Sequence, residues 1–234
     1  FRVARKVAES AEITSFYLEP MDGGPVLAHQ PGQYIGLRVT IDGAEQRRNY
    51  SLSAAPNGRD LRISVKREPG GAVSTHLHER VAEGDVLDVF PPAGVFTLAE
   101  GDKPVVLISG GVGITPTLAM LQAALQTARP VHFIHCARNG AVHAFRDAID
   151  VLAARYPQLK RFYCYEQAGD ATPDATGLLD EARLAQWLPA TRDVDAYFVG
   201  PKPFMALVKR SLKALGVPEA QTRYEFFGPA SALG

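Results

Sequence analysis

The stretch 105-VVLISGGVGITP-116 decides the fold of the C-terminal half of the chain. Its first five residues are apolar or small and do not alternate, which is typical of a strand buried on both faces of a parallel sheet. The glycines predict a tight turn after this strand. A helix is expected near residues 116–127, with Thr115 as its N-cap and Pro116 in its first position. A buried strand, a glycine-rich turn and a helix in this order predict an α/β domain.

Buried strands and amphipathic helices keep alternating from this stretch to the C-terminus. The alternation predicts a doubly wound α/β domain whose five-stranded parallel sheet has helices on both faces, and such a fold implies the strand order 3-2-1-4-5. Gly216 is expected to close the last helix in the left-handed conformation. The expected strands are 105–109, 131–136, 161–166, 196–200 and 223–227, and the expected helices lie near 116–127, 143–155, 178–188 and 203–215.

The chain before about residue 100 carries a different pattern. Apolar residues alternate with polar ones in 35–41 and again in 61–65, and turn-forming residues separate the runs. This pattern predicts a small antiparallel β-barrel or sandwich that one helix, 72-AVSTHLHERV-81, interrupts. The pattern changes after Lys103 and Pro104, so we predict a two-domain protein with domains 1–102 and 103–234.

Composition excludes several classes of protein. The 25 basic and 25 acidic residues cancel, so no broad field attracts nucleic acid or an anionic membrane. No apolar run approaches the ~20 residues that span a bilayer. Two cysteines cannot form a disulfide framework, which favours a reducing, cytoplasmic location. The chain begins at Phe1 and enters a strand-like stretch at once, which raises the expectation that it is part of a longer protein.

No metal site is predicted. His76 and His78 point about 200° apart on their helix, and His132 and His135 fall on opposite faces of a strand. The cysteines, Cys136 and Cys164, are expected on neighbouring strands as buried thiols rather than as a redox pair.

Two motifs in the first half can bind a phosphate-containing ligand. The run 48-RNYS-51 presents a guanidinium, an aromatic ring and a hydroxyl, although a polar edge strand is the alternative for these four residues alone. In 66-KREPGGAVSTHL-77, two glycines lead into a helix whose first amides and Ser74 hydroxyl can receive a pyrophosphate. The second motif favours the ligand-binding interpretation of the first.

Three motifs in the second half lie at strand ends. In 109-SGGVGITP-116 the missing side chains let a dinucleotide approach the backbone, but Pro116 replaces the third glycine of a Rossmann fingerprint. The second strand ends at Arg138 and not at an acid, so an ordinary Rossmann dehydrogenase is excluded. The run 199-VGPKPFM-205 is a strand-to-helix turn, and 224-YEFFGP-229 places an acid before an aromatic pair.

Together these motifs resemble the ferredoxin–NADP reductase superfamily. RNYSLS, VKREPGGAVSTHLHE, PPAGVF, LISGGVGITP, NGAVHAF and the terminal YEFFGP are similar to the reductase part of bacterial flavohaemoglobins. The resemblance implies an N-terminal β-barrel that binds FAD and a C-terminal α/β domain that binds NADH or NADPH.

The resemblance also implies the site residues. Tyr50 is expected against the isoalloxazine, Ser51 near its N5 and Phe226 over its face, with Ser51 and Glu225 as the catalytic pair. The FAD-binding set is Tyr34, Arg48, Asn49, Tyr50, Ser51, Lys66, Gly71, Val73, Ser74, Phe226, Phe227, Gly228 and Pro229. The NAD(P)H-binding set is Gly110, Gly111, Val112, Gly113, Ile114, Thr115, Pro116, Arg138, Gly200 and Pro201.

The implied function is an NAD(P)H oxidoreductase that passes hydride to flavin N5 and then single electrons to an acceptor. In the flavohaemoglobins the acceptor is the haem of an N-terminal globin domain, and the assembled enzyme converts nitric oxide and dioxygen to nitrate. Haem binding and that activity would require a globin domain, which these residues do not include. A free-standing flavin reductase and a non-catalytic dinucleotide-sensing module stay open as alternatives, as does the choice between NADH and NADPH.

Overall fold

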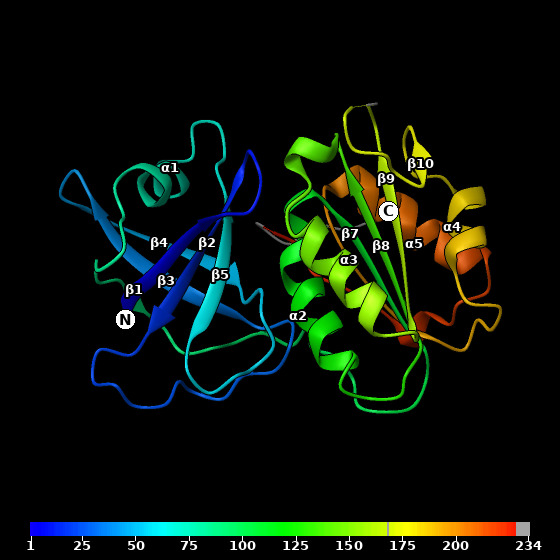
Figure 1. Ribbon diagram of the computed structural model, residues 1–234, viewed down its shortest axis with the longest axis horizontal. Coiled ribbons are helices and arrows are strands. Elements are labelled where there is room, and N and C mark those ends of the chain that lie inside the picture. The colour runs from blue at the N-terminus through cyan, green and yellow to red at the C-terminus, as the bar shows by residue number, and fades with distance from the viewer. Residues whose placement is uncertain (168, 228–234) are drawn as a thin grey trace.

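A computed structural model describes residues 1–167 and 169–227 (Figure 1). An antiparallel β part and an α/β part stand side by side, and the chain crosses from the first to the second once, between residues 89 and 105.

The N-terminal part consists of two three-stranded antiparallel sheets, in the orders β1-β2-β5 and β4-β3-β6, which enclose one apolar core. The isolated antiparallel pairings of Arg2 with Val86 and of Leu52 with Ile63 join the edges of the two sheets around this core. The antiparallel architecture and the helix predicted at 72–81 are confirmed. The elements are β1 (Arg2–Ala8), β2 (Ile13–Glu19), β3 (Tyr34–Ile41), β4 (Ala44–Ser51), β5 (Leu61–Lys66), α1 (Ala72–Glu79) and β6 (Asp88–Val89).

The C-terminal part is a parallel sheet in the order β10-β9-β8-β7-β11-β12. Helices α2 and α3 cover one face, and α4 and α5 cover the other (Figure 1). The doubly wound fold and the order of the five predicted strands are confirmed. The elements are β7 (Val105–Gly110), α2 (Ile114–Ala124), β8 (Val131–Ala137), α3 (Arg146–Arg155), β9 (Leu159–Tyr165), β10 (Ala175–Thr176), α4 (Glu181–Trp187), β11 (Asp195–Val199), α5 (Lys202–Ala214) and β12 (Thr222–Tyr224).

The sheet differs from the prediction at both edges. The short strand β10 adds a sixth strand beside β9, and its two residues are too few to show a periodic pattern. At the other edge β12 ends at Tyr224, so the predicted strand 223–227 is too long. Glu225 leaves the sheet and lies beside the barrel instead, as the site geometry below shows.

The helix starts also differ from the prediction. A 3₁₀ turn, Gly111–Gly113, leads directly into α2, so Gly113 is the N-cap and Pro116 is the third helical residue. A proline is tolerated there because the first amides of a helix have no intrahelical acceptor. Likewise α5 begins at Lys202 with Pro203 second, and α3 begins only at Arg146. Gly216, at φ +84°, follows α5 as predicted.

The two parts share an interface. Ile13 and Phe96 belong to the barrel half, yet both pack into the apolar cluster under α2 and α3. The Ala55 amide donates to Gln122 Oε1 at 2.9 Å, and the Ala11 amide donates to the Ala141 carbonyl at 3.0 Å. Apolar and polar contacts therefore both hold the barrel against the α/β part.

The search for membrane spans found no helix that is long and apolar enough, within residues 1–167 and 169–227. Cys136 and Cys164 are free thiols that lie opposite each other in the register of β8 and β9, as predicted for neighbouring strands. Cys164 is buried as predicted, whereas Cys136 is only half-buried.

Candidate functional site

The turn after β7 is packed against the turn after β11. A Cβ on Gly113 would stand 2.2 Å from the Val199 carbonyl oxygen, and one on Gly110 would stand 3.2 Å from Pro201 Cδ. A Cβ on Gly200 would stand 3.2 Å from the Gly110 amide nitrogen. The fold thus brings the two predicted NAD(P)H-binding segments, 110–116 and 200–201, into backbone contact.

This packing refines the role of the glycines. Gly113 and Gly110 lack side chains to make room for other parts of the protein, not only for a ligand. Gly111 alone of the three, at φ +56°, has no described atom within 4 Å of its Cβ position, so it faces open space. The side chains of Ile114, Thr115 and Pro116 are buried, while Val112 is half-buried. At this turn a ligand therefore meets mainly backbone.

Gly113→Ala is expected to lower the free energy of unfolding by about 1–3 kcal/mol, because the new methyl group collides with the Val199 backbone and cannot rotate away. Urea denaturation measures the change. Gly169→Ala is the matched control, since no described atom lies within 4 Å of its Cβ position, and it is expected to stay within about 0.5 kcal/mol. Equal stability of the two variants would contradict the packing argument.

The barrel and the end of the α/β part meet at Gly94. A Cβ on Gly94 would stand 3.0 Å from Tyr34 Cε1 and 3.9 Å from Glu225 Oε1. Tyr34 pairs with the buried Ser51 in the register of β3 and β4. Two predicted residues, Tyr34 and Glu225, therefore meet at one glycine, and Ser51 lies opposite Tyr34 on the neighbouring strand. Gly94 is absent from the predicted set, although its position in PPAGVF was the signal that could have identified it.

Burial shifts the pKa of two ionisable groups of this region. Loss of hydration raises the pKa of Glu225 from 4.5 to about 7. Glu225 can therefore gain or lose a proton near neutral pH. Burial also raises the pKa of Tyr50 to about 12, against the opposing effect of Arg48. The Tyr50 hydroxyl stays protonated, and its ring is the half-buried aromatic surface of β4.

The candidate phosphate end lies on β4 and α1. The exposed Arg48 guanidinium donates to the Arg47 carbonyl at 2.7 Å, and the Asn49 amide oxygen lies beside Gly36. Within the described chain, no side chain caps the amino end of α1 at Gly71, so the first amides of that helix can receive an anion.

Three predicted residues near α1 are engaged inside the protein. The Ser74 hydroxyl donates to the Gly71 carbonyl and accepts from the Glu68 amide, both at 3.1 Å. Val73 is buried in the barrel core, so only its backbone can reach a ligand. Lys66 forms an ion pair with Glu68 at 3.3 Å. The helix amides and Arg48 are thus the better anion-binding groups here.

Arg138 connects the two parts. Its guanidinium forms an ion pair with Glu12 in the turn between β1 and β2. Arg138 was predicted as a nucleotide-binding residue or an ordinary surface arginine, and the sequence carried no signal of its distant partner Glu12.

The terminal aromatics extend the sheet surface. Tyr224 stacks on Phe198 with ring centroids 5.1 Å apart, and Phe226 meets Tyr224 edge-on at 5.7 Å. Phe226 packs on the α4 and α5 side, and Phe227 is exposed. Predicted residues Gly228 and Pro229 lie outside the described residues.

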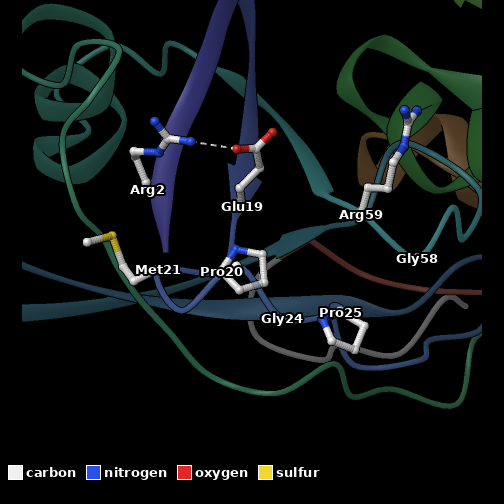
Figure 2. A pocket seen from close by; sticks show the side chains of 9 residues that line it. Arg2, Glu19, Pro20, Met21, Gly24, Pro25, Gly58 and Arg59 are labelled. Atoms are coloured by element: carbon white, nitrogen blue, oxygen red, sulfur yellow. Dashed lines mark hydrogen bonds and ion pairs between the residues drawn. The ribbon is translucent and has the colours of Figure 1, made fainter.

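Two cavities lie away from these residues. One of about 510 Å³ opens where β1 begins and β2 ends, between the Arg2–Glu19 ion pair and Arg59 (Figure 2). The other, of about 460 Å³, lies beside α1 at His76 and Arg80. In the part of the chain that the structure describes, neither cavity is lined by a predicted cofactor residue, and no group of three or more metal-ligating side chains occurs.

Comparison with known proteins agrees with this geometry. Two family models match: "Oxidoreductase FAD-binding domain" over residues 1–98 and "Oxidoreductase NAD-binding domain" over residues 107–210. The fold and the site therefore define an NAD(P)H oxidoreductase with one FAD-binding and one NAD-binding half.

The relatives narrow this class. The FAD/NAD-binding domain of nitric oxide dioxygenase from Vibrio cholerae is 41% identical, with a TM-score of 0.92 and 98% of each chain covered. The chain belongs to the flavohemoprotein family, as its FAD- and NAD-binding reductase part. Flavohemoproteins of Pseudomonas putida and Deinococcus radiodurans are 72% and 49% identical over the whole chain. The chain spans 60% of the length of these curated relatives.

Proposed function

We propose that the chain transfers hydride from NADH or NADPH to FAD and then passes single electrons to the haem of a globin domain in a longer protein. The whole protein would convert nitric oxide and dioxygen to nitrate. The names of the relatives, flavohemoprotein and nitric oxide dioxygenase, and the 60% coverage support this proposal. The observation that carries it is the meeting of Glu225, from the end of the α/β part, with Gly94 and Tyr34 of the barrel. A cytoplasmic location and a domain boundary at 102/103 belong to the same proposal.

The barrel residues would hold the flavin cofactor. Arg48 and the first amides of α1 neutralise phosphate charge, the neutral Tyr50 ring offers a stacking surface, and the Ser51 hydroxyl supplies a hydrogen bond. When bound, FAD accepts a hydride and releases electrons one at a time. The backbone around Gly111 and the turn at Gly200 and Pro201 would orient the nicotinamide nucleotide.

The test uses the purified chain loaded with FAD under anaerobic conditions. NADH and NADPH are added separately, and the visible flavin absorbance is followed. Rapid bleaching with at least one nucleotide, followed by reduction of an added ferric globin domain, is the expected result. FAD that is lost on gel filtration but turned over when free would favour the flavin reductase. Retained FAD that does not bleach would favour the sensing module.

Glu225→Gln is expected to remove a pH dependence near 7. A negative charge beside the flavin disfavours added electrons, so reduction of the wild-type flavin by NADH slows as the pH rises through about 7. The variant, always neutral, keeps its rate over pH 6–8. Glu219→Gln, at an exposed glutamate before the other end of β12, is the control and should behave as wild type. Identical profiles for Glu225→Gln and wild type would exclude this role.

The same carboxyl group affects stability. The folded state keeps the Glu225 proton up to a pKa of about 7, whereas the unfolded chain loses it near 4.5. Its contribution to stability is therefore present below about 4.5 and lost as the pH rises to about 7. The melting temperature of Glu225→Gln, compared with that of the wild type at pH 4.5 and pH 7, should lack this loss of stability.

A further inference from the structure

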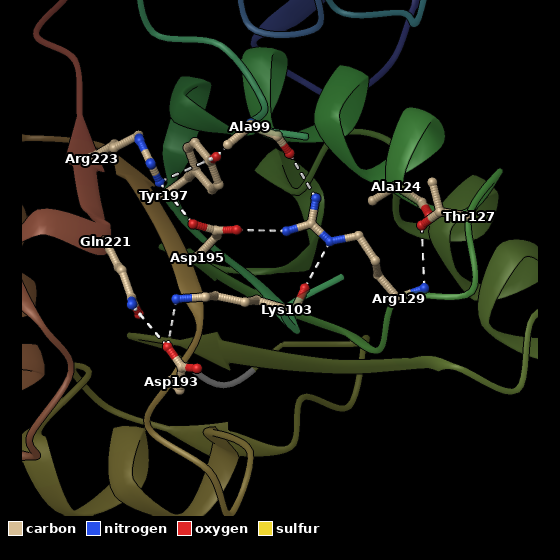
Figure 3. A network of polar contacts seen from close by, with 10 residues as sticks. All are labelled: Ala99, Lys103, Ala124, Thr127, Arg129, Asp193, Asp195, Tyr197, Gln221 and Arg223. Carbon is tan, nitrogen blue, oxygen red and sulfur yellow. Dashed lines mark hydrogen bonds and ion pairs between the residues drawn. The ribbon is translucent and has the colours of Figure 1, made fainter. Parts of the chain in front are cut away.

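A buried carboxylate at the start of β11 holds two arginines from different segments. Asp195 Oδ2 accepts a hydrogen bond from Arg129 Nη2 at 2.7 Å, and Oδ1 accepts one from Arg223 Nη1 at 3.0 Å (Figure 3). The side chains of Arg129 and Asp195 are 5% and 8% exposed. Such burial makes the pair sensitive to the loss of either charge.

Arg129 connects this carboxylate to the segment between the two domains. Its Nη1 donates to the Ala99 carbonyl and its Nε donates to the Lys103 carbonyl, both at 2.7 Å. The Ala99 amide in turn donates to the Tyr197 hydroxyl at 2.8 Å. Both backbone polar groups of Ala99 are therefore fixed to the α/β part (Figure 3).

Arg223 connects the same carboxylate to the strand that reaches the barrel. It lies opposite Tyr197 in the register of β11 and β12. Two residues further along, Glu225 lies beside Gly94. The interdomain segment and the terminal strand are thus held by the two oxygens of one side chain.

We propose that Asp195 is a positioning residue that sets the approach of the nicotinamide half-site to the flavin half-site. Hydride transfer needs reacting atoms about 3–3.5 Å apart, and a misplacement of about 1 Å costs about 100-fold in rate. Asp195 lies at the amino end of β11, whereas Gly200, in the candidate nucleotide site, follows its carboxyl end. Asp195 therefore affects hydride transfer through the placement of the barrel relative to the α/β part, not by contact with the nucleotide. The inference rests on the proposed hydride transfer at this junction.

A purely structural role predicts a different result from a positioning role. If the network only stabilises the fold, a variant that stays folded and retains FAD transfers hydride at the normal rate. If the contacts of Asp195 with Arg129 and Arg223 position the nicotinamide site relative to the flavin site, the affinity for NADH is kept while the rate of hydride transfer falls. The dissociation constant of NADH and the limiting rate of flavin reduction, measured by anaerobic stopped flow, separate the two.

The test compares four variants of the full chain. Asp195→Asn removes the charge that both arginines contact. Arg223→Gln removes only the partly exposed ion pair between β12 and Asp195, and it serves as the test if Asp195→Asn does not fold. Arg223→Lys keeps the charge. Lys103→Met is the matched control, because its ion pair with Asp193 at 2.7 Å is exposed and its backbone contact with Arg129 is unchanged.

Arg223→Gln is expected to lower the limiting rate about 10-fold or more with the NADH dissociation constant within about twofold of wild type, since misplacement affects rate before binding. Arg223→Lys should recover most of the rate, and Lys103→Met should match wild type. A normal rate in FAD-loaded Arg223→Gln, or an equal loss in Lys103→Met, would overturn the proposal. Failure of the wild-type flavin to bleach would instead reject the proposed function.

Discussion

Arg129→Met is expected to lower the free energy of unfolding by about 3–5 kcal/mol, because it leaves a buried carboxylate without its closest counter-charge. Arg223 still contacts Asp195, which favours the lower end of that range. The substitution also removes the hydrogen bonds to the Ala99 and Lys103 carbonyls. Chemical denaturation followed by circular dichroism measures the change.

The control for this prediction is another arginine that also pairs with an acid. Arg2 meets Glu19 at 2.8 Å, but the side chains are 54% and 42% exposed (Figure 2). Water and salt screen such a pair, so Arg2→Met is expected to cost less than about 1 kcal/mol. Comparable losses in the two variants would show that burial does not set the importance of the Arg129 contact.

Arg48→Gln is expected to weaken FAD binding about 10- to 150-fold. A charge-assisted hydrogen bond contributes about 1.5–3 kcal/mol, and about 1.4 kcal/mol corresponds to a factor of ten. Arg48 is free of acidic partners among the ion pairs of the described residues, so its charge is available to a phosphate. Quenching of flavin fluorescence on titration with the apoprotein measures the dissociation constant.

The neighbouring Arg47 supplies the matched control. It pairs with Glu45 at 2.8 Å, stacks over the Phe90 ring, and lies on the opposite face of β4 from Arg48. Arg47→Gln removes the same charge from the same strand and is expected to leave the FAD affinity within about twofold. An equal loss of affinity in both variants would point to a general effect of charge instead of a contact by Arg48.

The sequence predicts the fold well where long apolar patterns determine it. The unbroken run of β7 and the repeated strand–helix alternation predict a doubly wound fold, and that fold implies the observed order of the five predicted strands. Short elements are predicted less well: the two-residue strand β10 was missed, and the three-residue strand β12 was given the wrong bounds. The start of α2 was misplaced because Gly111–Gly113 enters a 3₁₀ turn, which glycine content alone does not reveal.

The candidate site was only partly predictable for a similar reason. Motifs predict residues whose proposed role depends on their own segment, such as Arg48 or Gly111. They carry no information about distant partners, so Arg129, a single basic residue before Pro130, gives no hint of Asp195, 66 residues later. The sequence also did not show that Gly113, a predicted nucleotide-binding residue, packs against Val199, since that contact is made by backbone atoms.

The facing cysteines of β8 and β9 provide a built-in reporter of local opening. A hydrogen bond to Cys164, together with burial, holds the pKa of the Cys136 thiol well above its usual value. Cys164 is 1% exposed. The same hydrogen bond lowers the pKa of the Cys164 thiol, so burial and not a scarcity of thiolate protects this side chain, and alkylation of Cys164 must wait until these strands separate. The rate of Cys164 alkylation in native buffer, compared with the rate for the unfolded chain, would then give the free energy of that opening without an engineered cysteine.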